Sequence, residues 1–240
     1  MRFLELGLEF STAITPVYGG GTAQVEWEVL TGTQAKRAFG STEFNLLTGK
    51  PLSSWVNHLN HHGYTRVATV ASEPHFFNVI HAYQSIGLQK SYFIQENAYP
   101  QATPGEQWLF DGDLLQQNLE KIQSWKKPYL NYVVGIYGHY AYNRNFDKRP
   151  DVVACGNSEM ARISNQFYYR TKALAHWVAN IEEKDSNAVI LAFGDHLPPI
   201  LNKSIQYAEK DQGTIVLQNN QLVIYLYLQL LLLNHVFHQY

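Results

Sequence analysis

The sequence contains little cysteine, little excess charge and no long uninterrupted hydrophobic run. Cys155 is the only cysteine among the 240 residues, so a disulfide within the chain is excluded. The formal net charge of -2 at pH 7 gives no basic field, and we expect no nucleic-acid partner. The apolar stretch 222–233 is interrupted by Gln229 and is too short to span a bilayer. Because no signal peptide is recognisable either, we expect a soluble domain or the soluble piece of a larger protein.

Short apolar segments alternate with amphipathic segments along the chain. This alternation is typical of an α/β fold with a mostly parallel sheet, and the length suits a single domain. We expect strands at residues 66–71, 91–95, 129–137 and 188–193. We expect helices at residues 23–30, 52–60, 76–86, 112–125 and 157–183. The last helix has one apolar face at helical spacing, formed by Met160, Ile163, Phe167, Leu174, Trp177, Val178 and Ile181.

A carboxylate and an imidazole follow the strand predicted at residues 188–193. The segment Gly194-Asp195-His196-Leu197-Pro198-Pro199 places both groups on a tight turn. Such a pair offers two ligands to one divalent cation, and ligands of open α/β sheets bind beyond the carboxyl ends of the strands. The alternative is an ordinary turn in which Asp195 caps the backbone and His196 is solvated.

A glycine-rich segment, Gly19-Gly20-Gly21-Thr22-Ala23, precedes the first predicted helix. Glycines let backbone amides approach a phosphate, and a helix N-terminus favours an incoming anion. A cation beside Thr22 would favour loss of its hydroxyl proton and make the oxygen a usable nucleophile. The alternative is a flexible loop that ends in a threonine N-cap.

Together the two segments resemble one protein family. Gly-Gly-Gly-Thr-Ala with a following Glu-Val-Leu-Thr-Gly, and later Gly-Asp-His-Leu-Pro-Pro, are similar to lipoteichoic acid synthases and related phosphoglycerol transferases. These enzymes belong to the alkaline phosphatase and sulfatase superfamily, and the resemblance runs from about residue 4 to residue 199. It implies an alkaline phosphatase/sulfatase-like α/β fold with a mostly parallel central sheet flanked by helices. It also implies that Thr22 is the nucleophile and, with Asp195 and His196, a ligand of a divalent metal.

The resemblance further implies a reaction and its partners. Glycerol phosphate would pass from phosphatidylglycerol, through a phosphothreonine-type intermediate, to a hydroxyl of a glycan, glycolipid or growing polymer. The metal expected is manganese, with Mg²⁺ or Zn²⁺ as alternatives. The parent protein would be membrane-anchored, and the domain would lie in the cell envelope on the extracytoplasmic side of the cytoplasmic membrane. Two alternatives stay open, namely a phosphoester hydrolase of the same superfamily and an inactive fragment of such an enzyme.

Two weaker matches add substrate-binding candidates. Tyr-Gly-His-Tyr-Ala-Tyr at residues 137–142 is similar to the family's His-x-Pro-Tyr motif, which implies that His139 contacts the substrate phosphate. Pro-His-Phe-Phe-Asn at residues 74–78 resembles a segment of the headgroup pocket, which implies that His75 and Phe77 line it. Val79 stands where that family has an arginine, and Arg144 or Arg149 would be the substitutes.

The resemblance also shows what this sequence lacks. Family members carry a further metal ligand, a glutamate, on a strand several tens of residues before the nucleophile, whereas Thr22 lies 21 positions after Met1. Glu5 and Glu9 belong to a segment that resembles a later part of the domain, so we do not expect them to be ligands. We therefore expect one incomplete catalytic domain over residues 1–240 without its first strand, with exposed edges where that interior strand is missing and weak or absent activity. Residues 200–240 are expected to form an atypical C-terminal tail, in which the apolar run is either one buried strand or an irregular end.

Overall fold

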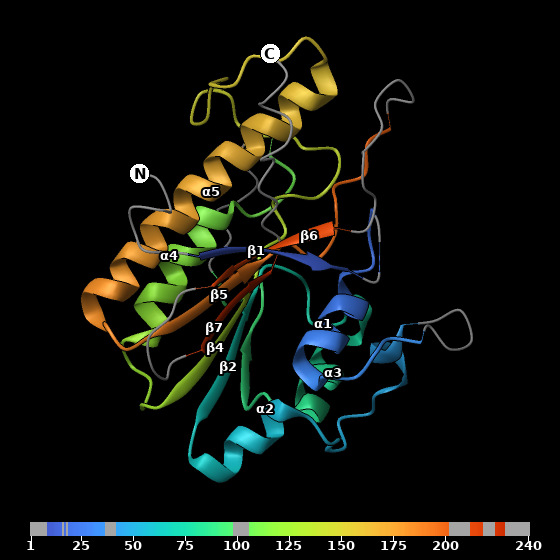
Figure 1. The fold of residues 1–240 in the computed structure, drawn as a ribbon, viewed down its shortest axis with the longest axis vertical. Helices are drawn as coiled ribbons and strands as arrows, with labels where there is room; N and C mark the ends of the chain where they lie inside the picture. Colours follow the sequence, from blue (N-terminus) through green and yellow to red (C-terminus); the bar gives the residue numbers. More distant parts are fainter. Residues whose placement is uncertain are drawn as a thin grey trace.

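The fold is a single sheet covered by helices on both faces (Figure 1). A computed structural model describes residues 9–15, 17, 19–36, 42–97, 106–201, 212–217 and 224–228. In chain order the strands are β1 (Glu9–Ile14), β2 (Thr65–Val70), β3 (Lys90–Tyr92), β4 (Tyr129–Val134), β5 (Val189–Phe193), β6 (Gln212–Leu217) and β7 (Ile224–Leu228). Their order across the sheet is β1-β6-β5-β7-β4-β2-β3.

Most neighbouring strands run parallel. The pairs β2–β3, β2–β4, β4–β7 and β5–β7 are parallel, whereas β5–β6 and β1–β6 are antiparallel. The predicted α/β fold with a mostly parallel central sheet is therefore confirmed. The antiparallel pairs lie together at one end of the sheet, away from β4.

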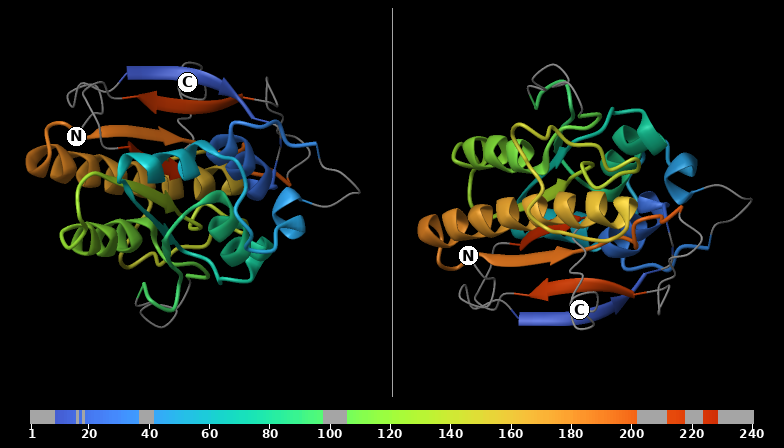
Figure 2. Two further views of the ribbon diagram at one scale, coloured as in Figure 1. Left: turned by 90° about the horizontal axis from the view of Figure 1, so that it is seen from below. Right: turned by 90° about the horizontal axis from the view of Figure 1, so that it is seen from above.

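Helices pack on both sheet faces and form two large cores, with a third, smaller apolar cluster around the start of the longest helix. The α-helices are α1 (Thr22–Thr31), α2 (Trp55–His58), α3 (Val79–Ile86), α4 (Asp111–Ile122) and α5 (Ser158–Lys184), with 3-10 helices η3 (Glu43–Leu46), η4 (Leu59–His62) and η5 (Phe76–Asn78). Figures 1 and 2 show α4 and α5 on one face and α1 to α3 on the other. All seven residues of the predicted apolar face of α5 are buried, four of them against β4 and β5. None of the helices in the described ranges combines the length and apolar character needed to cross a bilayer.

Strand β7 occupies the interior of the sheet although it is the last described strand in the chain. Leu226 pairs with Tyr132 of β4 on one side and with Leu191 of β5 on the other. The expectation of exposed edges at a missing interior strand is therefore wrong, because a segment of the predicted C-terminal tail closes the sheet there. Strand β6 also belongs to that tail, whereas residues 202–211, 218–223 and 229–240 lie outside the described residues, as does Glu5.

Several predicted boundaries shift for local reasons. The helix predicted at 52–60 begins at Trp55, because the Ser54 side chain accepts a hydrogen bond from Asn57 N and caps it. The helix predicted at 76–86 is interrupted where Phe77 and Asn78 have positive φ angles of 50° and 58°. The strand predicted at 129–137 ends at Val134, and the chain then turns over α4, where Tyr137 N donates to Asp111 Oδ1.

Candidate active site

Two loops that are far apart in the sequence meet at the carboxyl end of β5. Gly19 N donates to the main-chain oxygen of Leu197 at 3.2 Å, which joins the glycine loop to the Asp195–His196 turn. The φ angles of Gly19, Gly20 and Gly21 are 64°, 147° and 97°, a region that other residues rarely adopt. The three consecutive glycines are thus required by the path of the backbone into α1.

Thr22 is the first residue of α1, and its hydroxyl does not cap the helix. The N-cap is Gly21 in the left-handed conformation, without a side-chain cap. The Thr22 hydroxyl instead donates to Asp195 Oδ2 at 2.5 Å, across 173 residues of sequence. Asp195 is only 2% exposed. The alternative of a threonine N-cap is therefore wrong, and the structure brings Thr22 and Asp195 together.

His196 is oriented toward the same carboxylate oxygen. Its Nδ1 lies 2.9 Å from the main-chain oxygen of Leu197, and its main-chain N donates to Asp195 Oδ1 at 3.0 Å. Its Nε2 lies 3.3 Å from Asp195 Oδ2. When Nδ1 carries the proton and donates to Leu197, the lone pair of Nε2 faces the point where Thr22 and Asp195 meet.

Thr22, Asp195 and His196 bring a hydroxyl, a carboxylate and an imidazole together. These ligand types suit a hard or borderline divalent cation. The described residues contain no cluster of three or more His, Cys, Asp and Glu side chains that could hold a metal. Thr22, Asp195 and His196 therefore fit a divalent metal as a partial ligand set, with further coordination positions left to water or substrate oxygens.

Glu26 is a buried carboxyl of the site that the sequence analysis missed. It lies one helical turn after Thr22 on α1 and lines the same cavity. Its Oε2 accepts a hydrogen bond from the Tyr83 hydroxyl at 2.5 Å. Burial raises the pKa of Glu26 from 4.5 to about 8; the hydrogen bond from Tyr83 opposes this shift, and the negative charge of Asp195 adds to it. The only sequence signal for Glu26 as a site residue is its position four residues after Thr22, which places both on the same face of a predicted helix.

The larger lobe of the site is a cavity of about 250 Å³ in front of Thr22. Its lining includes Thr22, Glu26, Phe77, His139 and His196. Phe77 is 36% exposed, so its ring is available to a ligand. The structure thus places Phe77 and His139 at one cavity with Thr22. His75 is exposed and is not among the residues that line this lobe, so its assignment to the headgroup pocket stays a prediction.

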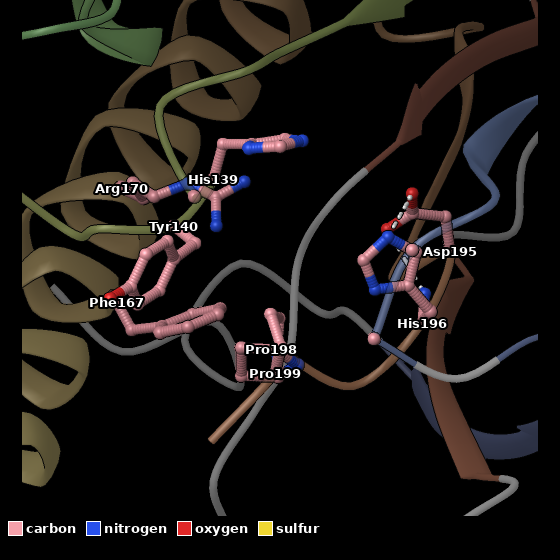
Figure 3. A pocket seen from close by; sticks show the side chains of 11 residues that line it. His139, Tyr140, Phe167, Arg170, Asp195, His196, Pro198 and Pro199 are labelled. Carbon is pink, nitrogen blue, oxygen red and sulfur yellow. Dashed lines mark hydrogen bonds and ion pairs between the residues drawn. The ribbon is translucent and has the colours of Figure 1, made fainter. Parts of the chain in front are cut away.

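A smaller lobe lies beside the larger one and shares Gly19, Gly20, His139 and His196 with it. Its remaining lining consists of Gly138, Tyr140, Phe167, Arg170, Asp195, Pro198 and Pro199. Figure 3 shows His139, Tyr140, Phe167 and Arg170 on one side of this lobe, opposite Asp195 and His196. The site therefore has two lobes that meet at the two histidines.

Neither arginine suggested as a substitute for the one absent at Val79 lines the two lobes. Arg144 pairs with Asp151, and Arg149 pairs with Glu106 and donates to the Tyr137 hydroxyl. Arg170 of α5 is the arginine that lines the site. The sequence pattern assigns it only to the long helix, because its approach to the site depends on how α5 packs below the loop of His139.

Sequence comparison gives the family and a distant relative. A family model described as Sulfatase matches residues 1–220. A Rhizobium meliloti (strain 1021) protein named for cyclic beta-1,2-glucan modification is 25% identical over an alignment of 203 residues that covers 80% of this chain. The chain spans 31% of that relative's length.

Comparison with solved structures gives the same fold at low sequence identity. The lipoteichoic acid synthase LtaP of Listeria monocytogenes superposes with a TM-score of 0.72 at 15% identity, covering 91% of this chain and 60% of its own. The phosphoglycerol transferase GacH of Streptococcus pyogenes, in complex with sn-glycerol-1-phosphate, gives 0.63 at 14%, covering 90% and 59%. The periplasmic domain of Escherichia coli EptC in complex with Zn gives 0.56 at 14%, covering 88% and 62%. The chain thus spans about three-fifths of each structure, and all three share its alkaline phosphatase/sulfatase-like fold.

Proposed function

This chain belongs to the sulfatase family, and on that basis we propose that it is a metal-dependent phosphoglycerol-type transferase domain with Thr22 as its nucleophile. The observation that carries the proposal is the 2.5 Å hydrogen bond from the Thr22 hydroxyl, at the N-terminus of α1, to Asp195 Oδ2. A hydroxyl held against a buried carboxylate, at a helix N-terminus, is placed to lose its proton and attack a phosphoryl group.

Two displacements at phosphorus would complete the reaction. In the first, Thr22 Oγ1 forms a bond to phosphorus, the bond from phosphorus to the diacylglycerol oxygen breaks, and that oxygen gains the proton that Thr22 loses. In the second, an acceptor hydroxyl oxygen bonds to phosphorus, the bond to Oγ1 breaks and Thr22 regains a proton. His139 borders both lobes and would contact the phosphoryl oxygens in either step.

Thr22, Asp195 and His196 would hold a divalent metal, with manganese as the first choice and Mg²⁺ or Zn²⁺ as alternatives. Such an ion, when bound, supplies positive charge that stabilises the threonine oxygen and the phosphoryl oxygens. The orientation of His196 Nε2 toward Asp195 Oδ2 supports this ligand set.

The larger lobe would receive the headgroup of a phospholipid such as phosphatidylglycerol, with Phe77 against the glycerol. The acceptor would be a glycan or glycolipid, which a relative named for glucan modification supports. A solved neighbour bound to sn-glycerol-1-phosphate supports glycerol phosphate as the transferred group. The domain would act on the extracytoplasmic side of the cytoplasmic membrane as part of a membrane-anchored protein, as the periplasmic location named for EptC supports.

The nucleophile can be tested by trapping the intermediate. With Mn²⁺ and fluorescent phosphatidylglycerol, we expect diacylglycerol release and a phosphoglycerol adduct on Thr22 by mass spectrometry. Thr22→Ala should abolish the adduct and lower turnover by at least about 10³-fold. Thr31→Ala is the matched control, because that hydroxyl lies at the other end of α1 and donates to Trp27 O.

Three other outcomes are informative. Equal turnover by Thr22→Ala would overturn the assignment of the nucleophile. Release of glycerol phosphate to water, with no transfer to any sugar acceptor, would indicate a phosphoester hydrolase. No turnover by the folded parent chain would favour an inactive member of the family, as the valine at position 79 and the partial ligand set suggest.

A further inference from the structure

The smaller lobe has the chemistry of a carbohydrate subsite, and we infer that it binds an uncharged sugar ring of the acceptor. The inference deepens the proposed function, on which it rests, by naming the acceptor class and the side chains that select it. Nothing in the sequence pattern points to this lobe, because Tyr140, Phe167 and Arg170 come from two different elements and the two prolines from a third.

The position of the lobe suits an acceptor. Asp195 and His196 line the smaller lobe, and His196 also lines the larger lobe. Thr22 lines the larger lobe only. A molecule seated in the smaller lobe therefore borders the reaction centre without covering the nucleophile. The phospholipid headgroup and the acceptor therefore do not need the same space in the site.

The walls of the lobe offer flat apolar surfaces. The Tyr140 ring is 44% exposed and lies edge-on to Tyr142, with 5.8 Å between ring centroids. Phe167 and the rings of Pro198 and Pro199 complete the apolar lining, as Figure 3 shows. The C–H faces of a sugar ring pack well on such surfaces, which explains why aromatic side chains suit carbohydrate ligands.

The charge of the lobe favours a neutral ligand over an anion. Arg170 is 1% exposed, and its Nε donates to Asp111 Oδ2 at 2.6 Å, while Asp111 is fully buried. The charge of Asp111 offsets that of the guanidinium, so Arg170 gives the lobe less net positive charge than an unpaired arginine would. Asp195, the carboxyl-bearing residue in the lining, adds no positive charge to the lobe. In the metal-free protein a phosphate or carboxylate would therefore find little attraction here, whereas hydroxyl groups can exchange hydrogen bonds with the polar atoms of the wall.

The same ion pair fixes the geometry of the lobe. Asp111 also accepts a hydrogen bond from Tyr137 N, and a Cβ at Gly138 would overlap the Arg170 guanidinium. The pair thus lies directly below the loop that carries His139 and Tyr140. Because the loop rests on a buried ion pair, the aromatic wall is preformed, which reduces the entropic cost of sugar binding.

The test measures sugar binding in metal-free protein, so that phosphate binding to a metal does not interfere. Saturation-transfer NMR is recorded with methyl β-glucoside and with glucose 6-phosphate on the full chain. We expect the neutral glucoside to bind at least as tightly as the phosphorylated sugar. Tyr140→Ala should weaken glucoside binding about 3- to 10-fold, the loss expected for one ring contact.

Tyr168→Ala is the matched control. Tyr168 is 37% exposed and also lies edge-on to a neighbouring tyrosine, but it does not line the lobe. Absence of glucoside binding, tighter binding of glucose 6-phosphate, or equal losses in both variants would overturn the inference. This test measures binding of a sugar in the absence of a phosphoryl donor, whereas the test of the nucleophile measures an adduct on Thr22, so a failure of the proposed nucleophile and a failure of the sugar lobe give different results.

Discussion

At the scale of single residues, the site combines an ordinary-looking threonine with an unusual glutamate. Thr22 is recognisable from the glycine string before it, and Asp195 and His196 from the turn after a buried strand. Glu26 is not recognisable, because its environment comes from Tyr83, 57 residues further along the chain. The place of Arg170 at the site is not recognisable either, because it depends on contacts with Asp111 and Gly138, which are distant in the sequence.

The raised pKa of Glu26 predicts a pH-dependent stability. Above pH 4.5 the unfolded chain releases this proton, whereas the folded state keeps it until the pH approaches about 8. The folded state therefore binds more protons in this window, and the free energy of unfolding should fall as the pH rises from 4.5 to 8. The full effect is at most about 4–5 kcal/mol, at 1.36 kcal/mol per pKa unit. Glu26→Gln should remove this contribution in urea unfolding of EDTA-treated protein.

A second variant separates Glu26 from the other carboxyls. Tyr83→Phe deletes the hydrogen bond that lowers the pKa of Glu26, so the decline in stability should extend to higher pH. Parallel pH profiles for wild type and Glu26→Gln would show that Glu26 does not hold the proton.

At the scale of elements, a buried amide pair joins four of them below the site. Asn118 of α4 and Asn131 of β4 exchange two hydrogen bonds of 2.9 Å. Asn118 also donates to Thr69 of β2 and accepts from the indole of Trp177 on α5. The amides of this pair are buried, and each keeps its hydrogen bonds only when α4 and α5 are correctly placed on the sheet. The hydrogen bonds therefore fix the positions of the two helices.

Removal of both partners should cost less than the sum of the two single removals. Asn118→Leu leaves the Asn131 amide buried without its partner, and we expect a loss of about 2–4 kcal/mol in the free energy of unfolding. The double variant Asn118→Leu/Asn131→Leu should lose less than the sum of the two single variants. Strict additivity in urea unfolding would contradict the proposed coupling.

At the scale of the whole molecule, the sheet depends on a strand that sequence reasoning could not place. The predicted strands have the expected α/β alternation, but the run at 222–233 carries no turn or helix signal that fixes its neighbours. Strand β7 within this run pairs with β4 and β5, which lie about 90 and 35 residues earlier in the chain. Only these long-range pairings, and not local pattern, decide that it closes the sheet.

A proline substitution tests this interior position. Leu226→Pro removes a backbone donor from a strand paired on both sides, and we expect a loss of about 3 kcal/mol or more in the free energy of unfolding. Ser11→Pro in the edge strand β1 is the control, with a smaller expected loss. Equal effects in circular dichroism melts would place β7 outside the folded sheet.

The interior place of β7 also determines when the molecule can fold during synthesis. Strands β2, β3 and β4 form one half of the sheet, and β1, β5 and β6 form the other, with β7 as the only bridge between them among the described strands. The ribosome makes β7 after all the others, so the two halves stay unjoined until its residues emerge. Each half exposes an unpaired interior edge during that interval, the kind of surface that chaperones cover and that pairs wrongly with other chains.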